Sequence, residues 1–572
     1  MRGRCNLVEK VKTLLDLINN SPLGDVPFHK GKLYIIANLY LTADEKKYLD
    51  VYADKDLLDF CKETNSYLAD KDLKAIRSLF NSFNKDEIKA LVLNTLSTEY
   101  TGYRDFTESS SDSLFEVASA ILDIDGAGHI VFDLGSGNGG VLGKILSKAQ
   151  ENGFVLKDLI GYEINVEQAK MSQMALDILS NGDPKPIIKI GNVLDESKFV
   201  FTRGYCFPPL GLKQFFREKS RPSKLFKKIE FTTRNTGEWL FVDSLLSGMT
   251  EVSKAVAVVS GRALFNYADE EYRKTLIESG MLEAIIELPI GSLNFTGVKP
   301  YLLVFSNGNK EVKLINVSEA IDTKTKRINK VEIAVDKVLS MYRSSEVPTR
   351  SNDALKNINN LVPSNVLLDV DKPKNGVPLG GLAEVFTGNQ YTLGVFEKNG
   401  MLSSEPTGYR ILTSSDIEDG VVDWKGLRSI VYNDDKFDKY AVKKDDVVVT
   451  SKSSKVKTVV VDIEPKEKIL VTGGMIIVRP DVKLLNPTYL KIFLDSEQGQ
   501  NALKRIQKGS IIITINSKEL STVLIPVIDI NKQIGKAQKY NEKLSTLYAL
   551  KQEAKKLEDS LKNFYLDESE EE

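Results

Sequence analysis

The sequence predicts a multidomain α/β protein, with an N-terminal helical domain, a doubly wound Rossmann-like middle domain and a C-terminal α+β domain that ends in a long helix. Its length of 572 residues is several times that of a typical domain, which favours two to four domains. In the middle of the chain, apolar strand-like runs alternate with helical stretches. The last third is rich in strands and turns before a single long helical pattern begins.

Residues 1–100 are expected to form the helical domain. Apolar residues recur at spacings of three and four in Ala43–Tyr52 and in Asp70–Phe83, which is typical of amphipathic helices. This part of the sequence carries no recognisable catalytic constellation.

Residues 101–310 alternate between strand and helix patterns. Helices are expected at Val166–Leu179 and Glu238–Thr250, between the strand candidates. This alternation favours a parallel sheet with helices on both faces. The expected strands are His129–Leu134, Leu159–Ile164, Pro186–Val193, Lys254–Ser260, Leu282–Leu288 and Tyr301–Ser306.

The remainder of the chain divides into three predicted parts. Residues 311–373 are charged and irregular, and are expected to connect two domains, whereas residues 374–530 are rich in strand patterns. Residues 531–565 predict one long helix with an apolar stripe, which suits either packing on a partner helix or lying on its own domain. The stripe consists of Leu544, Leu547, Leu550, Ala554, Leu557 and Leu561.

Composition limits the possible functions. The 77 Lys and Arg residues are balanced by 79 Asp and Glu residues, so a nucleic-acid surface would have to be a local patch. Two histidines and three scattered cysteines argue against a zinc site, histidine-based catalysis and a disulfide framework, and suit a reducing cytoplasm. No apolar run approaches the roughly 18 residues that span a bilayer, so no membrane association is expected.

The strongest motif is the glycine-rich run Val131–Gly140. An apolar strand ends at Asp133, and three glycines then allow a tight turn before a helix: Gly135, Gly137 and Gly139. By itself, this pattern suits a dinucleotide, a nucleotide or no ligand at all.

Two later strand ends narrow the ligand class. The second strand ends at Glu163 and Ile164, where a carboxylate can accept both hydroxyl groups of a ribose. The third ends at Asn192 and Val193, where the amide can reach the edge of an adenine. Because adjacent strand ends converge in a doubly wound sheet, the sequence predicts a site for an adenosyl ligand.

From these residues onward, the chain resembles the modification (M) subunits of type I restriction-modification systems, DNA adenine-N6 methyltransferases that use S-adenosyl-L-methionine. The run GYEINVEQAKMSQMALDIL is similar to the helix of their second motif, and the region from Gly237 to Phe305 follows their pattern. Thr107 stands where that family touches the cofactor, although Glu108 replaces the usual proline. The resemblance covers about residues 100–310, and implies an S-adenosylmethionine-dependent methyltransferase domain.

The catalytic motif departs from the family pattern. Amino-methylating enzymes carry Asn-Pro-Pro-Phe or Asp-Pro-Pro-Tyr after the fourth strand, where a side-chain oxygen accepts a hydrogen from the adenine amine and the aromatic ring stacks on the flipped base. Here Pro208 and Pro209 are kept, but Phe207 replaces the acceptor and Leu210 the aromatic ring. Tyr205 could supply the missing stacking surface.

Two interpretations therefore stay open. Family resemblance favours a working adenine-N6 methyltransferase with a divergent motif. Residue chemistry favours a pseudo-methyltransferase that binds cofactor and DNA as a recognition or scaffold subunit, similar to the degenerate partner in the heterodimeric RNA adenosine methyltransferase. An RNA methyltransferase is less favoured, because the C-terminal part resembles proteins that read duplex DNA.

A basic stretch follows this motif and is a candidate for gripping phosphates, with a solvated loop as the alternative. Its candidate DNA contacts are Lys213, Arg217 and Arg221.

The C-terminal part resembles one target-recognition domain of a type I specificity (S) subunit. The similar segments include VPLGGLAEVFTGNQ, GYRILTSSDIEDGVV and KYAVKKDDVVVTSKSS, in the family's order over about 190 residues. The resemblance implies recognition of double-stranded DNA. The candidate contacts are Lys452, Lys455, Lys457 and Lys508.

This chain has one such domain, whereas a separate specificity subunit has two. The difference predicts a homodimer that is paired through the terminal helices and reads a two-fold symmetric DNA site. A separate restriction subunit or active methyltransferase subunit is the other expected partner. The sequence shows neither a helicase P-loop nor a convincing nuclease constellation.

Overall fold

The computed structural model forms two compact units, Met1–Leu367 and Leu368–Glu572. The residues that it describes are 2–21, 28–42, 59, 63, 66, 68–97, 112–180, 183–195, 199–211, 220–293, 296–324, 331–368, 373–431, 435–452, 456–508 and 514–567. Among these residues, none of the helices has the length and hydropathy to cross a bilayer.

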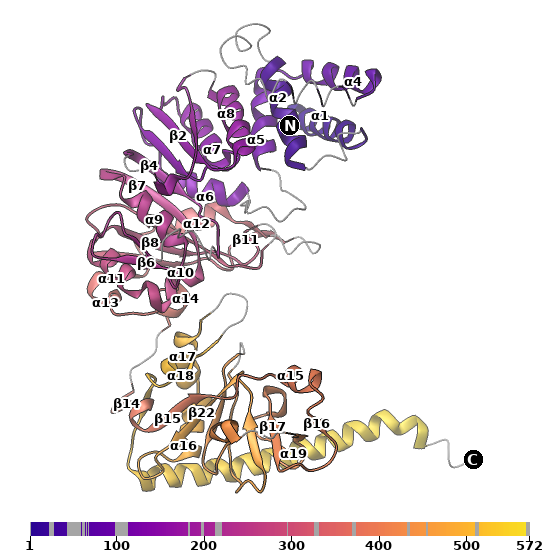
Figure 1. Ribbon diagram of the computed structural model, residues 1–572, viewed down its shortest axis with the longest axis vertical. Coiled ribbons are helices and arrows are strands. Elements are labelled where there is room, and N and C mark those ends of the chain that lie inside the picture. The colour runs from indigo at the N-terminus through magenta and orange to yellow at the C-terminus, as the bar shows by residue number, and fades with distance from the viewer. Residues whose placement is uncertain are drawn as a thin grey trace. The chain divides into compact units, whose positions relative to one another are not determined.

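Unit 1 is built on a nine-stranded sheet with the order β13-β10-β8-β9-β7-β4-β1-β2-β3 (Figure 1). From β7 to β3 all neighbours are parallel, and the strand order reverses between β1 and β4. In a doubly wound sheet this switch point opens a crevice at the carboxyl ends of the strands. The strands are β1 Ile130–Leu134, β2 Asp158–Glu163, β3 Ile187–Ile190, β4 Phe201–Cys206, β7 Met249–Ser260, β8 Leu282–Glu287, β9 Pro300–Phe305, β10 Glu311–Asn316 and β13 Thr349–Ser351.

Helices cover both faces of this sheet, as the sequence predicted (Figure 1). One core contains the apolar sides of α6 Asp112–Leu122, α7 Gly140–Glu151, α8 Val166–Ser180 and α12 Val335–Arg343. The opposite core holds the other group of helices, with Trp239 and Tyr272 fully buried. These helices are α9 Glu238–Leu246, α10 Gly261–Phe265, α11 Glu270–Glu278, α13 Asn352–Leu355 and α14 Pro363–Val366.

The N-terminal region is helical but does not form a unit of its own. Its helices are α1 Arg2–Asn19, α2 Phe28–Thr42, α4 Asp70–Asn81 and α5 Lys85–Ser97. Their buried residues, such as Leu14, Ile36 and Leu91, belong to the same core as α7 and α8. The predicted helix at 43–52 lies outside the described residues.

Two sequence expectations need correction. The sheet is mixed rather than parallel, because β9 runs antiparallel to both β7 and β8. The described residues between β8 and β9 contain no helix, and without a helical crossover the chain reverses direction.

The second correction concerns the segment 311–373, which was expected to be a connector. Residues 311–367 belong to unit 1, and β10 pairs with β8 in the large sheet. The buried side chains of Val312 and Leu314 explain this, because a charged-looking segment still presents an apolar face to the core. A small hairpin, β11 Ile321–Lys324 with β12 Val331–Ile333, precedes α12.

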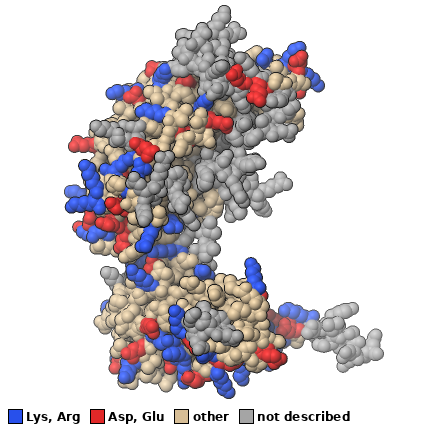
Figure 2. All heavy atoms as spheres, viewed as in Figure 1, with Lys and Arg blue, Asp and Glu red and all other residues tan. Residues whose placement is uncertain are grey.

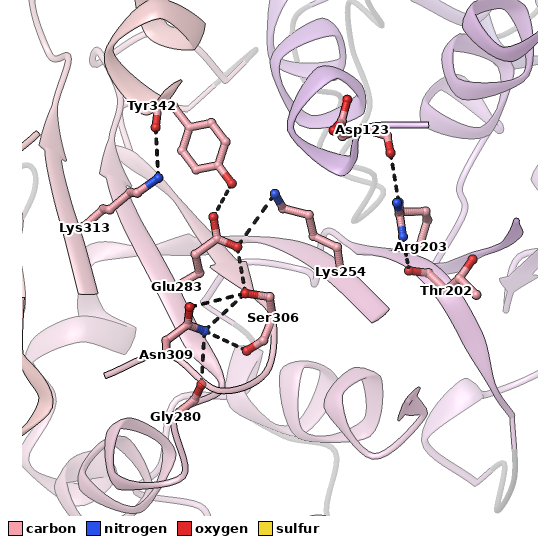
Figure 3. Close-up of polar contacts among 10 residues, drawn as sticks. All are labelled: Asp123, Thr202, Arg203, Lys254, Gly280, Glu283, Ser306, Asn309, Lys313 and Tyr342. Atoms are coloured by element: carbon pink, nitrogen blue, oxygen red, sulfur yellow. Dashed lines mark hydrogen bonds and ion pairs between the residues drawn. The ribbon is translucent and has the colours of Figure 1, made fainter. Parts of the chain in front are cut away.

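At the amino edge of the sheet, a polar cluster attaches α12 to the strands (Figure 3). The Tyr342 hydroxyl donates to Glu283, which also accepts a 2.8 Å hydrogen bond from Ser306 and pairs with Lys254 at 3.7 Å. Lys254 and Lys313 lie 5.2 and 4.9 Å from the centre of the Tyr342 ring. Burial and the Glu283 charge hold the pKa of Tyr342 well above its usual value, so the ring stays neutral.

Unit 2 is an α+β structure with two four-stranded sheets. The first has the order β15-β22-β19-β20, with β15 Ala383–Thr387, β22 Met475–Pro480, β19 Val447–Thr450 and β20 Thr458–Val460. The second has the order β16-β18-β17-β21, with β16 Leu402–Ser403, β18 Arg428–Ile430, β17 Tyr409–Leu412 and β21 Lys468–Val471. The remaining elements are β14 Gly376–Pro378 paired with β23 Leu524–Pro526, and the helices α15 Leu393–Lys398, α16 Pro487–Asp495, α17 Glu497–Ile506 and α18 Ser517–Leu520.

The last helix, α19, spans Ile530–Asp567 and is anchored by its first turns (Figure 1). Gln533 is fully buried and donates to the carbonyl groups of Leu484 and Ile528, while Lys491 of α16 bonds the Tyr540 hydroxyl at 3.2 Å. Further along, the stripe is exposed within this chain, with Leu550 58% and Leu557 64% accessible.

Candidate cofactor and DNA-modification site

The glycine-rich turn joins β1 to α7 at the switch point of the sheet. Gly135, Gly137 and Gly139 adopt φ values of 89°, 52° and 84°, a region that side chains with a Cβ rarely occupy. A Cβ on Gly139 would lie 2.4 Å from Ser172 Oγ of α8, so this glycine also permits a close approach between the two helices. Asn138 of the turn donates to the Leu96 carbonyl oxygen at 2.8 Å, which ties the turn to α5.

Glu163, at the end of β2, lies against this turn as the sequence predicted. Its Oε2 accepts a 2.8 Å hydrogen bond from the Gly137 amide, and its Oε1 accepts one of 2.8 Å from the Asn165 amide. Each carboxylate oxygen has two lone pairs, so each can accept a further hydrogen bond from a ligand hydroxyl. Ile164 follows directly and is 64% exposed, which leaves an apolar surface beside the carboxylate.

Asp133 ends β1 in a buried setting. It is 2% exposed, and burial together with the nearby Glu163 charge raises the pKa of its carboxyl well above the usual value. Within the described part of the chain, its Oδ1 and the Ser136 hydroxyl have no hydrogen-bond partner. Buried polar atoms in native proteins nearly always have one, so these atoms fit a site that a polar ligand or ordered water completes.

Asn192 does not point freely into the crevice. Its Oδ1 accepts from the Leu194 amide at 3.2 Å, and its amide group donates to Asp195 at 3.0 Å. Short side chains of this type often bond the backbone two residues ahead, and here the bond shapes the turn Val193–Asp195. Val193 is buried beneath this turn.

The segment after β4 lies at the same switch point, because β4 is the parallel neighbour of β1. Phe207 and Leu210 are half-buried and pack against the core that contains α7 and α8, while Pro208 is buried. Tyr205 is only 2% exposed, so its ring lies inside the core rather than on a surface where a base could stack. The sequence had not singled out this burial, nor the contact between Ser172 and Gly139.

The basic stretch after this segment is described only in part. Thr107, Lys213 and Arg217 lie outside the described residues. Arg221 lies in the hairpin of β5 Ser220–Pro222 and β6 Glu230–Thr232, and its guanidinium donates to Asp195 at 3.1 Å. Arg221 therefore links the hairpin to the Asn192 turn, while Lys227 and Lys228 between the two strands are exposed.

In unit 2 the structure brings two predicted basic positions together. Lys452 and Lys508 each form a β-bridge with Thr514, although the Lys508 ammonium group is paired with Glu519. Lys457 donates to the carbonyl oxygens of Ser414 and Ile417, and Lys455 lies outside the described residues. Figure 2 shows Lys and Arg interspersed with Asp and Glu over the face that it draws of each unit, with no broad field of one sign.

The fold defines a class: a Rossmann-like α/β protein with a glycine-rich turn and the Glu163 carboxylate side by side at the carboxyl edge of its sheet. Residues 111–374 match the family described as N-6 DNA Methylase. The matched range ends close to the boundary of unit 1, which agrees with the place of β10 and β13 in the large sheet. A comparison with curated proteins finds no match.

Several solved structures are similar. The type I restriction-modification system methyltransferase subunit from Streptococcus thermophilus is 15% identical, with 63% of this chain and 98% of that chain covered and a TM-score of 0.45. The type IIG restriction endonuclease BpuSI is 13% identical over 94% of this chain and 75% of that chain, with a TM-score of 0.44. The type I restriction enzyme EcoKI M protein is 16% identical, with 67% of this chain and 82% of that chain covered and a TM-score of 0.33.

Proposed function

We propose that this protein is an adenine-N6 DNA methyltransferase of the type I restriction-modification class that uses S-adenosyl-L-methionine and carries one DNA target-recognition domain. The observation that carries the proposal is the contact between the glycine-rich turn and Glu163 at the switch point of a domain that matches the N-6 DNA Methylase family. The target-recognition part rests on sequence resemblance and on the α+β architecture of unit 2.

The residues of the crevice fit this cofactor. Glu163 has lone pairs left for the two ribose hydroxyl groups, and Ile164 offers an apolar surface for the adenine ring. The glycine-rich turn, without side chains, lets the ligand approach the backbone. When bound, the cofactor would supply a methyl group on a positively charged sulfonium, and the buried Asp133 carboxyl group would face a cationic part of the cofactor.

The transfer step needs an adenine base held against the segment that follows β4. The Pro208 carbonyl oxygen can accept one hydrogen of the adenine amine, which leaves the amine lone pair free to attack. Phe207 cannot accept the second hydrogen, and loss of one such contact commonly slows an enzyme about 100- to 1000-fold. We therefore expect a slow enzyme.

A second candidate follows from the same segment. With Phe207 in place of the acceptor, Leu210 in place of the aromatic ring and Tyr205 buried, the chain would bind cofactor and DNA without transfer. It would then be the recognition or scaffold subunit of a complex whose active methyltransferase is another chain.

The proposed partner is double-stranded DNA. The exposed Lys227 and Lys228 of the β5–β6 hairpin supply phosphate contacts beside the crevice, and Lys452 supplies one in unit 2. The exposed leucines of α19 suit a homodimer, with a restriction subunit as a further partner and the cytoplasm as the location.

A transfer assay tests this proposal. The purified chain is incubated with methyl-labelled S-adenosylmethionine and with DNA from a host that lacks the gene, and N6-methyladenine is measured. Slow incorporation that the Glu163→Gln variant loses supports the enzyme. If the chain binds cofactor and DNA but transfers no methyl group, the result favours the recognition or scaffold subunit. If the chain does not bind the cofactor, the result contradicts both candidate functions.

A further inference from the structure

Tyr205 occupies an unusual position for a tyrosine. It is the second-last residue of β4, it lies 2% exposed in the core beside α6 and α7, and its hydroxyl has no hydrogen-bond partner among the described residues. A buried tyrosine hydroxyl normally has a partner, because burying an unpaired polar group is unfavourable. A phenylalanine would fill the same apolar space without this cost.

A second unpaired atom lies on the next strand. Tyr205 and Asp133 are register partners on the parallel strands β4 and β1, so their side chains leave the same face of the sheet. Asp133 Oδ1 is also buried and has no partner in the described structure. Two buried oxygens without a described partner therefore lie on the same face of adjacent strands, near the carboxyl edge of the sheet.

The chemistry of the pair favours a cationic group with several hydrogens. Burial and the Glu163 charge raise the pKa of Asp133 in the free protein, and a cation bound beside it would lower that pKa again. The ionised Asp133 accepts only, and a phenol oxygen can accept as well as donate, so the two together suit an ammonium group. Burial makes such a contact stronger, since little solvent competes with it.

The position also identifies which part of the cofactor lies there. Glu163 fixes the ribose at the end of β2, and the methyl group must reach the segment that follows β4. The methionine tail is then left near the junction of β1 and β4, where Asp133 and Tyr205 lie.

We propose that Tyr205 is a cofactor-binding residue, whose hydroxyl and the Asp133 carboxylate together hold the ammonium group of the methionine tail of S-adenosylmethionine. This inference rests on the proposed function, because it places a further residue in the same cofactor site.

Calorimetric titration of the full chain with two ligands tests the inference. S-adenosylmethionine contains the methionine tail, whereas 5′-methylthioadenosine keeps the adenosine and lacks the ammonium group. Tyr205→Phe removes only the hydroxyl, and should weaken S-adenosylmethionine binding about 10-fold, as expected for a hydrogen bond to a charged group, while methylthioadenosine binding stays within about 2-fold. Tyr272→Phe, at a buried tyrosine of the opposite core, serves as the control and should change neither affinity.

Denaturant unfolding without ligand supplies an independent readout. Because the hydroxyl has no partner within the described structure, Tyr205→Phe should unfold at the same or a higher denaturant concentration than wild type. Equal affinity of wild type and Tyr205→Phe for S-adenosylmethionine, or equal losses for both ligands, would overturn the role of Tyr205 and leave the proposed function intact. If wild type binds neither S-adenosylmethionine nor methylthioadenosine, the proposed function itself fails, and this inference fails with it.

Discussion

The Gly137 amide donates a 2.8 Å hydrogen bond to the Glu163 carboxylate, and this bond ties the glycine-rich turn after β1 to the end of β2. The other carboxylate oxygen holds the Asn165 amide at the start of α8. One side chain thus fixes both the glycine-rich turn and the start of α8 before any ligand arrives. Such preorganisation lowers the ordering cost of binding.

Replacing Glu163 tests this arrangement. Glu163→Gln removes the charge and one acceptor oxygen, so S-adenosylmethionine should bind about 10- to 100-fold more weakly, as expected for loss of charged hydrogen bonds. Isothermal titration measures the change, with Glu151→Gln at the exposed end of α7 as the control. An unchanged affinity for Glu163→Gln would contradict the assignment of the ribose site.

Gly139 should tolerate no side chain. Gly139→Ala places a Cβ at a φ of 84° and within 2.4 Å of Ser172 Oγ. Gly153→Ala meets a similar φ of 71°, but none of the described residues places an atom within 4 Å of its Cβ. Gly153→Ala should therefore lower the free energy of unfolding by about 1–2 kcal/mol, and Gly139→Ala by about 1–3 kcal/mol more. Denaturant titration compares the two variants.

Adding Ser172→Ala to Gly139→Ala removes the nearest clashing atom and should recover part of that extra loss. No recovery would mean that Ser172 is not the limiting contact.

Asp177 of α8 makes the unfolding free energy depend on pH. Burial raises its pKa from 3.8 to about 6, although Gln173 donates to it at 3.0 Å. The native state then holds the proton more tightly than the unfolded state, so Asp177 lowers stability progressively as pH rises from about 4 to above 6. The loss approaches about 3 kcal/mol at neutral pH, at about 1.4 kcal/mol per pKa unit.

Asp177→Asn keeps an acceptor for Gln173 but cannot ionise. It should therefore raise the free energy of unfolding far more at about neutral pH than at acidic pH. Denaturant unfolding at the two pH values measures the difference, with the exposed Glu167→Gln on the same helix as the control. An equal effect of Asp177→Asn at both pH values would rule out titration of Asp177 as the cause.

The Tyr342 cluster at the amino edge of the sheet should matter for stability and not for cofactor binding (Figure 3). Tyr342→Phe keeps the ring between Lys254 and Lys313 but removes the donor to Glu283, and should cost about 1–3 kcal/mol. Thermal or denaturant unfolding measures the loss, and Tyr267→Phe, at a 65% exposed ring, is the matched control. A weaker affinity for S-adenosylmethionine in Tyr342→Phe would show that the two edges of the sheet are coupled.

Local patterns in the sequence predicted the parts of the fold that depend on neighbouring residues. The strand before Asp133, the glycine-rich turn and the strand that ends at Glu163 are all signalled by short apolar runs and by residue types with special backbone freedom. Because β1 and β2 are adjacent, these signals also predicted that Glu163 would meet the turn.

Features that depend on distant pairing were not predictable in this way. The antiparallel direction of β9 and the place of β10 in the sheet are fixed by partners about 20 to 50 residues away in sequence. Asn192 satisfies a local turn instead of pointing outward, and the burial of Tyr205 follows from its register with Asp133. Neither property is visible in the residue types alone.

The most direct test compares methyl transfer by wild type and Phe207→Asn, with labelled S-adenosylmethionine and DNA from a host that lacks the gene. The asparagine side chain of this variant would restore the missing acceptor for the adenine amine. We therefore expect slow N6-adenine methylation by wild type and at least about 10-fold faster transfer by the variant. No transfer by either protein, with cofactor and DNA both bound, would contradict the enzyme and identify the chain as a recognition subunit.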